Sequence, residues 1–222
     1  MGLNKQSGNM YPFVDYTWNT VKGKCPHDCS YCFMKVYPLN PVRFDSSELK
    51  TDLGSGYFIF VGSSCDMWAE GIPDEWLRKT FEHILKYPDN TYLFQTKNPE
   101  RFIHYAGFPP FVYLGITIES NRDYKISKAP SPQERIDSFI VVDHPMKMVS
   151  IEPVLDFDVD VLIGWMRDVK PEFISIGADS KGHKLQEPSS EKLQDLISGL
   201  KRFTDVRVKE NLGRLGVFHG SS

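Results

Sequence analysis

The chain has 222 residues, of which 41% are hydrophobic, and a formal charge of −3 at pH 7. This length can bury a substantial core, so we expect one domain over residues 1–222. The balanced charge gives no sign of the strongly basic surface that tight binding to a phosphate backbone favours. No apolar stretch approaches the roughly 18 to 20 residues of a membrane span and no secretion signal is evident, which predicts a cytoplasmic protein.

Predicted strands and helices alternate along the chain. Residues 1–12 are polar and read as a loose lead-in, and a short helix is expected at 30–36. Strands are predicted from β-branched and apolar runs at 13–18, 57–62, 91–95, 111–118, 146–151, 172–176 and 205–209. Helices are predicted from apolar stripes and capping residues at 74–87, 98–105, 131–141, 159–169 and 190–203.

This alternation predicts an α/β fold with a parallel sheet and right-handed crossovers. The strands are too few for a regular eight-stranded barrel, so a curved, incomplete barrel of TIM type is expected, a partial (β/α)6 barrel with outer helices. Periodicity alone does not separate it from a doubly wound open sheet. Both folds place ligands at the carboxyl ends of the strands.

Residues 25–32 read CPHDCSYC and place Cys25, Cys29 and Cys32 at i, i+4 and i+7. Three thiolates on one loop can hold three irons of a 4Fe-4S cluster, which normally takes four cysteines. The fourth iron would then be open to a substrate or cofactor, just as an open metal position marks catalytic zinc sites.

Two other readings of this loop remain. A disulfide framework would use dispersed, paired cysteines, whereas these three are crowded and Cys65 alone is left over. A structural zinc site could use the three cysteines with His27, although zinc sites usually join two knuckles from separate stretches.

The C-x3-C-x2-C spacing, with Tyr31 before the last cysteine, resembles the signature of the radical S-adenosylmethionine (radical SAM) superfamily. The resemblance implies that SAM chelates the open iron and that the reduced cluster cleaves it to methionine and a 5'-deoxyadenosyl radical, which abstracts hydrogen from a substrate. By position, Cys25, Cys29 and Cys32 would bind the cluster and Tyr31 would pack near the adenine. The resemblance also implies an electron donor of flavodoxin or ferredoxin type.

Polar residues follow the predicted strands where a cofactor would lie. After the strand at 57–62, small and acceptor-rich residues suit the SAM ammonium group, or else form an ordinary tight turn: Gly62, Ser63, Ser64 and Asp66. The resemblance implies a SAM amino-group site here, although the sequence departs from the usual Gly-Gly-Glu-like segment. Lys97 suits the methionine carboxylate or an anionic substrate, or is a solvated surface charge.

Three further strand ends carry candidate residues. Thr117 and Glu119 point to the same side of one strand and suit a ribose diol or the SAM ammonium group. Ser150 and Glu152 repeat this spacing on the next strand, where a buried glutamate needs a partner. Gly177 would let an adenine ring lie close to the backbone.

Six segments along the chain extend the resemblance: VGSSCD, LFQTKNPERF, YLGITIES, VSIEPVLDF, ISIGADS and VRVKENLG. Over about residues 16–213 they resemble small phage-associated and prokaryotic radical-SAM-like proteins that are distantly similar to spore photoproduct lyase. In the photoproduct lyase group a cysteine returns a hydrogen atom to the substrate radical. Cys65 would take that role here, or is a small buried thiol used for packing.

We therefore expect a radical SAM enzyme that uses a 4Fe-4S cluster and S-adenosylmethionine. One alternative is a zinc-stabilised module that binds nucleic acid through residues such as Tyr37, Arg43, Lys201 and Arg207. Another is an iron-sulfur electron-transfer protein without SAM chemistry. The substrate is not identified by the sequence, and nucleic acid is one candidate class.

Overall fold

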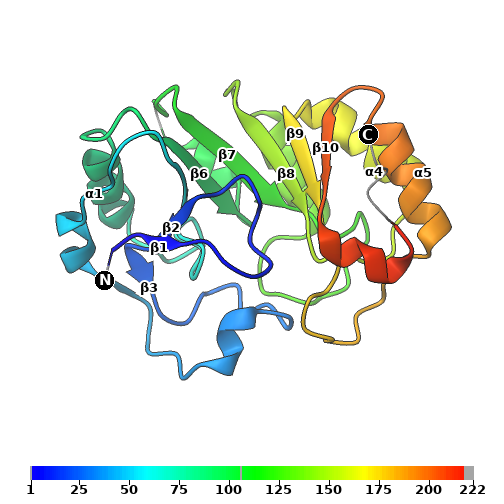
Figure 1. Ribbon diagram of the computed structural model, residues 1–222, viewed down its shortest axis with the longest axis horizontal. Coiled ribbons are helices and arrows are strands. Elements are labelled where there is room, and N and C mark those ends of the chain that lie inside the picture. Colours follow the sequence, from blue (N-terminus) through cyan, green and yellow to red (C-terminus); the bar gives the residue numbers. More distant parts are fainter. Residues whose placement is uncertain (1, 106, 218–222) are drawn as a thin grey trace.

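The computed structural model describes residues 2–105 and 107–217 and contains one large, curved sheet (Figure 1). Its spatial order is β1 (Asn4–Lys5), β2 (Tyr16–Trp18), β5 (Phe58–Val61), β6 (Thr91–Thr96), β7 (Val112–Thr117), β8 (Lys147–Ile151), β9 (Phe173–Ile176) and β10 (Asp205–Val208). The strands from β2 to β10 run parallel, and β1 pairs antiparallel with β2. The predicted parallel α/β sheet is confirmed. Because the strands follow chain order without a reversal, the doubly wound alternative is wrong.

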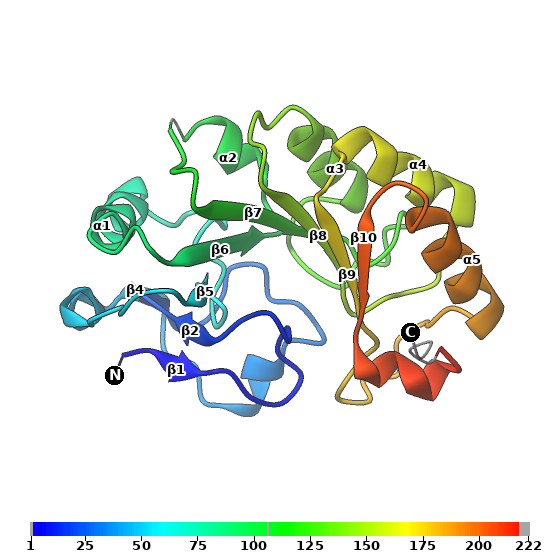
Figure 2. The ribbon, with the colours of Figure 1, turned by 45° about the horizontal axis from the view of Figure 1, so that its top comes forward.

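The helices cover the convex side of the sheet (Figure 2). They are α1 (Asp74–Ile84), α2 (Glu100–Ile103), α3 (Pro132–Ile140), α4 (Val159–Val169) and α5 (Ser190–Leu200). Helix α3 begins at the predicted capping box of Ser131 and Glu134. The predicted helix at 98–105 is shorter than expected, and the other helices match their predicted ranges to within a few residues at each end. Within the described residues, no helix has the length and apolar character that a membrane crossing needs.

The cysteine loop lies on an excursion from the sheet, residues 21–44, which we call the arm. Strands β3 (Val21–Lys22) and β4 (Arg43–Phe44) pair antiparallel and close its base. The arm contains the short 3₁₀ helix η1 (Phe33–Val36), where a helix at 30–36 was expected, and η2 (Ser46–Lys50) follows it. Another 3₁₀ helix, η3 (Glu210–Leu215), follows β10. The arm therefore leaves the rest of the fold and returns to it at the same place, the β3–β4 pair.

The concave side of the sheet is covered by the N-terminal segment, which was expected to be loose. Tyr11 is only 5% exposed and packs with Phe60, Leu93, Met148 and Phe173 in a second core, separate from the larger core under the helices. Figure 2 shows this dark blue segment on the side of the sheet opposite the helices. The prediction of a loose lead-in is wrong, because the aromatic side chain of Tyr11 packs on the sheet against residues far away in the sequence, and the local sequence does not reveal such a contact.

Candidate functional site

Two consecutive turns shape the cysteine loop, residues 25–32. The Asp28 N–H donates to the Cys25 carbonyl and the Cys32 N–H to the Cys29 carbonyl, each at 3.2 Å. Asp28 has a left-handed φ of 47°, a conformation that Asp tolerates better than most residues. The loop is also bound to the segment after β7, because Ser30 donates to the Ile126 carbonyl (2.8 Å) and Lys128 to the His27 carbonyl (2.7 Å). The loop is thus held by backbone contacts at both ends.

The three thiols of the loop are free and lie near one another. Cys29 is buried, and Cys25 and Cys32 are half-buried. Burial raises the pKa of Cys29, the nearby charge of Lys97 lowers it, and Glu119 and the other two loop cysteines raise it further. A cubane takes each thiolate on a different iron, so three neighbouring free thiols beside a cation suit the donor set of a 4Fe-4S cluster.

A single metal ion makes a different demand, because all its ligands must surround one point. Among residues 2–105 and 107–217, no three or more His, Cys, Asp and Glu side chains are gathered in that way. The Cys3His zinc arrangement with His27 is therefore not formed in this part of the chain.

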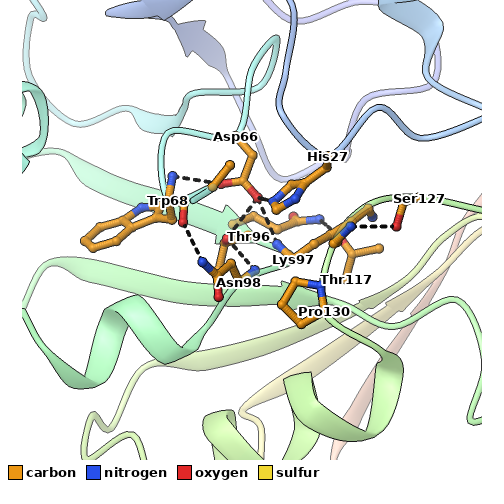
Figure 3. Close-up of polar contacts among 12 residues, drawn as sticks. His27, Asp66, Trp68, Thr96, Lys97, Asn98, Thr117, Ser127 and Pro130 are labelled. Carbon is orange, nitrogen blue, oxygen red and sulfur yellow. Dashed lines mark hydrogen bonds and ion pairs between the residues drawn. The ribbon is translucent and has the colours of Figure 1, made fainter. Parts of the chain in front are cut away.

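His27, between the first two cysteines, contacts a buried carboxylate (Figure 3). Its Nε2 lies 2.8 Å from Oδ2 of Asp66, which follows β5. The Thr96 hydroxyl (2.8 Å) and the Lys97 N–H (2.9 Å) donate to the same oxygen, and the Trp68 N–H donates to Oδ1 (2.9 Å). Burial alone would raise the pKa of Asp66, but His27 and these donors hold it below its ordinary value. Asp66 thus joins the ends of two strands to the loop.

Tyr31, between the last two cysteines, contacts a second buried carboxylate. Its hydroxyl donates to Oε1 of Glu119, which follows β7. Lys97 Nζ lies 3.0 Å from the same oxygen, and Arg135 Nη1 lies 2.7 Å from Oε2. Burial alone would raise the pKa of Glu119, but the charges of Lys97 and Arg135 and the Tyr31 hydrogen bond lower it to about 2. Glu119 is therefore an ionised, fully paired group.

The predicted residues Gly62, Ser63 and Ser64 form a turn at the end of β5. Gly62 has a φ of +80°, which favours glycine. The Ser64 N–H (2.9 Å) and the Ser63 hydroxyl (3.3 Å) both donate to Oδ1 of Asn19, which follows β2. The turn is tied to the residues that lead into the arm, and both serines are partly exposed there.

Thr117 on β7 and Ser150 on β8 lie on the concave face of the sheet. The Gln95 amide donates to the Thr117 hydroxyl (2.8 Å). The Tyr11 hydroxyl lies 2.7 Å from Ser150 Oγ and 3.0 Å from Gln95 Oε1. The N-terminal segment thus brings a phenol against Ser150, and Gln95 links that phenol to Thr117.

Glu152 forms a third, largely buried ion pair, at the ends of β8 and β10. Lys209 Nζ lies 2.9 Å and 3.0 Å from its two carboxylate oxygens, and the Asn9 amide donates to Oε1 (2.8 Å). Burial raises the pKa of Glu152, against the charge of Lys209. A Cβ on Gly177 would lie 2.7 Å from this carboxyl group. The space beside Gly177 is therefore filled by Glu152, where the sequence suggested room for an adenine ring.

Cys65 belongs to the core under the helices rather than to the concave face with Thr117 and Ser150. It is 2% exposed, and its thiol hydrogen-bonds with Cys25. This contact lowers the pKa of Cys25 and raises that of Cys65. The Cys65 thiol is directed toward a predicted cluster ligand.

The sequence analysis missed two groups of residues. Arg135 lies in the interior of α3 and also donates to the carbonyls of Pro130 (2.7 Å) and Thr117 (3.0 Å), but no sequence spacing connects it to the cysteines. Asn9 and Tyr11 lie in a stretch without periodicity. A buried arginine at a core position of an amphipathic helix was the one available signal, since such a residue needs a partner.

A family described as a protein of unknown function, DUF5131, matches residues 40–191, a range that begins after the cysteine loop. No curated protein matches the chain in sequence. Among solved structures, a mutant of spore photoproduct lyase with bound AdoMet and dinucleoside spore photoproduct has a TM-score of 0.63 at 12% identity, over 91% of this chain and 78% of that one. A second, complexed with dinucleoside spore photoproduct, has a TM-score of 0.65 at 12% identity, over 92% and 78%. At this identity the likeness shows a common fold.

Proposed function

The chain belongs to the DUF5131 family of proteins of unknown function, and we propose that it is a radical SAM enzyme. The observation that carries the proposal is the placement of three free, neighbouring cysteines on one loop over the carboxyl ends of β5, β6 and β7. Its fold resembles that of spore photoproduct lyase, one structure of which has bound AdoMet. We propose further that residues 1–222 form one domain with a partial TIM-type barrel.

Cys25, Cys29 and Cys32 would hold the cluster, which when bound supplies the electron that cleaves SAM to methionine and a deoxyadenosyl radical. The chain's own residues would bind SAM, orient it and exclude water from the site. The ammonium of Lys97 and the guanidinium of Arg135 both face the carboxylate of Glu119, and the charge of Lys97 also acts on Cys29. A cation beside the loop thiols suits an anionic cluster or the SAM carboxylate. The hydroxyls of Thr117 and Ser150 lie on the concave face, where Gln95 and Tyr11 donate to them.

The test is anaerobic reconstitution with iron and sulfide, followed by reduction with dithionite in the presence of SAM. We expect a brown protein that forms 5'-deoxyadenosine, and loss of both iron and deoxyadenosine in Cys29→Ala. A matched control is Ser30→Ala, which changes an exposed neighbour on the same loop without removing a thiol. Deoxyadenosine formation by Cys29→Ala at the wild-type rate would contradict the proposal.

The same preparation separates the two alternatives. A zinc-stabilised module predicts a colourless protein with one zinc and no sulfide. An electron-transfer protein predicts a cluster whose spectrum does not change when SAM is added. We also propose an electron donor of flavodoxin or ferredoxin type, which would replace dithionite in a reconstituted assay.

A further inference from the structure

Two of the side chains that lie between successive cysteines, His27 and Tyr31, are each bound by a largely buried carboxylate. We call the His27–Asp66 and Tyr31–Glu119 contacts the two clamps. The carboxylates come from the ends of different strands, β5 and β7, and reach the loop at its two halves. The first clamp lies between Cys25 and Cys29, and the second between Cys29 and Cys32.

Lys97, at the end of the strand between them, joins the two clamps. Its backbone N–H donates to Asp66 (2.9 Å), and its ammonium lies 3.0 Å from Glu119 and 5.4 Å from the centre of the Tyr31 ring. Side-chain exposure is 11% for Asp66, 3% for Glu119 and 12% for Lys97. Buried charges held at this many points occupy one geometry, because each alternative leaves a charge unpaired.

We propose that the two clamps fix the cysteine loop in its cluster-binding shape before any cluster binds. Asp66, Glu119, Lys97 and Arg135 are then positioning residues, which act on the thiols through His27 and Tyr31. Their hydrogen-bonding groups are taken up by the loop and by the neighbouring strand ends, in place of the SAM contacts that the sequence suggested for Asp66 and Glu119. The inference rests on the proposed function in one respect, namely that the loop binds a cluster.

Preorganisation of this kind has a chemical use at a three-cysteine site. A loop that must fold around its cluster loses ordering free energy at that moment, whereas a loop already ordered does not. The loop also supplies only three ligands to the cluster, so fewer bonds to metal are available to hold its shape. The protein therefore supplies from strand ends the constraint that a fourth ligand would otherwise give.

The decisive variant is Tyr31→Phe, which removes one hydroxyl and keeps the ring. Its matched control is Tyr113→Phe, which removes another Tyr–Glu hydrogen bond, to Glu172 at 2.7 Å, at the opposite end of the sheet. Both are studied as the metal-free full-length chain, by hydrogen exchange of residues 25–32 and by the rate at which iodoacetamide alkylates Cys29. Circular dichroism confirms that each variant is folded.

In the wild-type chain we expect protected loop amides and slow alkylation of Cys29. Tyr31→Phe should raise both rates by about tenfold or more, the scale of a lost hydrogen bond to a charged group. Tyr113→Phe should leave both unchanged. His27→Gln, which cannot reproduce the imidazole contact, should loosen the first half of the loop. The double variant should fall short of the product of the two effects, because Lys97 joins the clamps and each single variant already removes their mutual support.

An unprotected loop in the wild-type chain, or equal rates in Tyr31→Phe and Tyr113→Phe, would overturn the proposal. Because these measurements use metal-free protein, they do not depend on whether SAM is cleaved. If the clamp proposal is wrong, the loop amides of the wild-type chain should exchange fast while deoxyadenosine formation is normal. Failure of the proposed function would show as no deoxyadenosine despite an ordered loop.

Discussion

At the scale of single residues, the site consists of charges that satisfy one another. Buried carboxylates are costly unless they are paired and hydrogen-bonded, and Asp66, Glu119 and Glu152 all meet that condition. Cys65 differs from these carboxylates, because a neutral thiol carries no charge that must be paired, and its partner is another cysteine, Cys25. Its contact with Cys25 places a fourth thiol beside one of the proposed cluster ligands.

Cys65→Ala therefore tests the open iron. With three thiolates left, we expect the reconstituted variant to hold wild-type amounts of iron and sulfide, and the spectrum of its reduced cluster to change when SAM is added. Iron analysis and electron paramagnetic resonance measure both. Loss of the cluster in this variant would identify Cys65 as a ligand and favour the electron-transfer alternative. If Cys65 is instead the proposed hydrogen donor, the variant would stall only once a substrate is supplied.

At the scale of elements, the arm depends on its base. Lys22 on β3 lies 2.8 Å from Asp45 and 2.6 Å from Glu48, which is buried. Asp45 also accepts from the N–H and hydroxyl of Ser47 and so caps η2. These contacts join β3, β4 and η2 at the point where the arm leaves the sheet.

The hydrogen bonds from Lys22 and Ser47 lower the pKa of Asp45 from 3.8 to about 2. A carboxyl group whose pKa is lower in the folded state stabilises that state above its ordinary pKa and loses the effect as the pH falls through its folded pKa. We expect the free energy of unfolding of the metal-free protein to fall between about pH 4 and pH 2, and Asp45→Asn to flatten this part of the curve. Urea titrations at several pH values measure it. An identical pH dependence in both proteins would exclude a role for Asp45.

At the scale of the whole molecule, the sheet has two edges and is covered on both faces. The helices cover its convex side, and residues 9–14 cross its concave side between β2 and β10. Arg207 on β10 stacks on Phe13 (4.8 Å) and Phe173 (3.6 Å), and Lys209 lies 5.0 Å from the Tyr11 ring. The N-terminal segment thus joins strands from the two ends of an open sheet.

Tyr11→Ala should lower the free energy of unfolding by about 3 to 5 kcal/mol, as other truncations of large buried aromatic side chains do. Tyr11→Phe removes only the hydroxyl and should cost about 0.5 to 1.5 kcal/mol, the usual net value of one hydrogen bond. Equilibrium urea unfolding measures both. Equal stability of Tyr11→Ala and the wild type would show that the segment does not belong to the core.

The sequence by itself determined the alternation of strands and helices, because hydrophobic period and capping residues act over a few neighbouring positions. It also located the three cysteines and the strand ends around them, since parallel strands place their carboxyl ends on one edge. What Asp66, Glu119, Glu152 and Gly177 contact was decided only by the tertiary structure. The partners of those residues, His27, Tyr31, Lys209 and Arg135, lie from 16 to 88 residues away along the chain. The partner of a buried charge is whichever opposite charge the fold brings within hydrogen-bond distance, and local pattern carries no record of that distance.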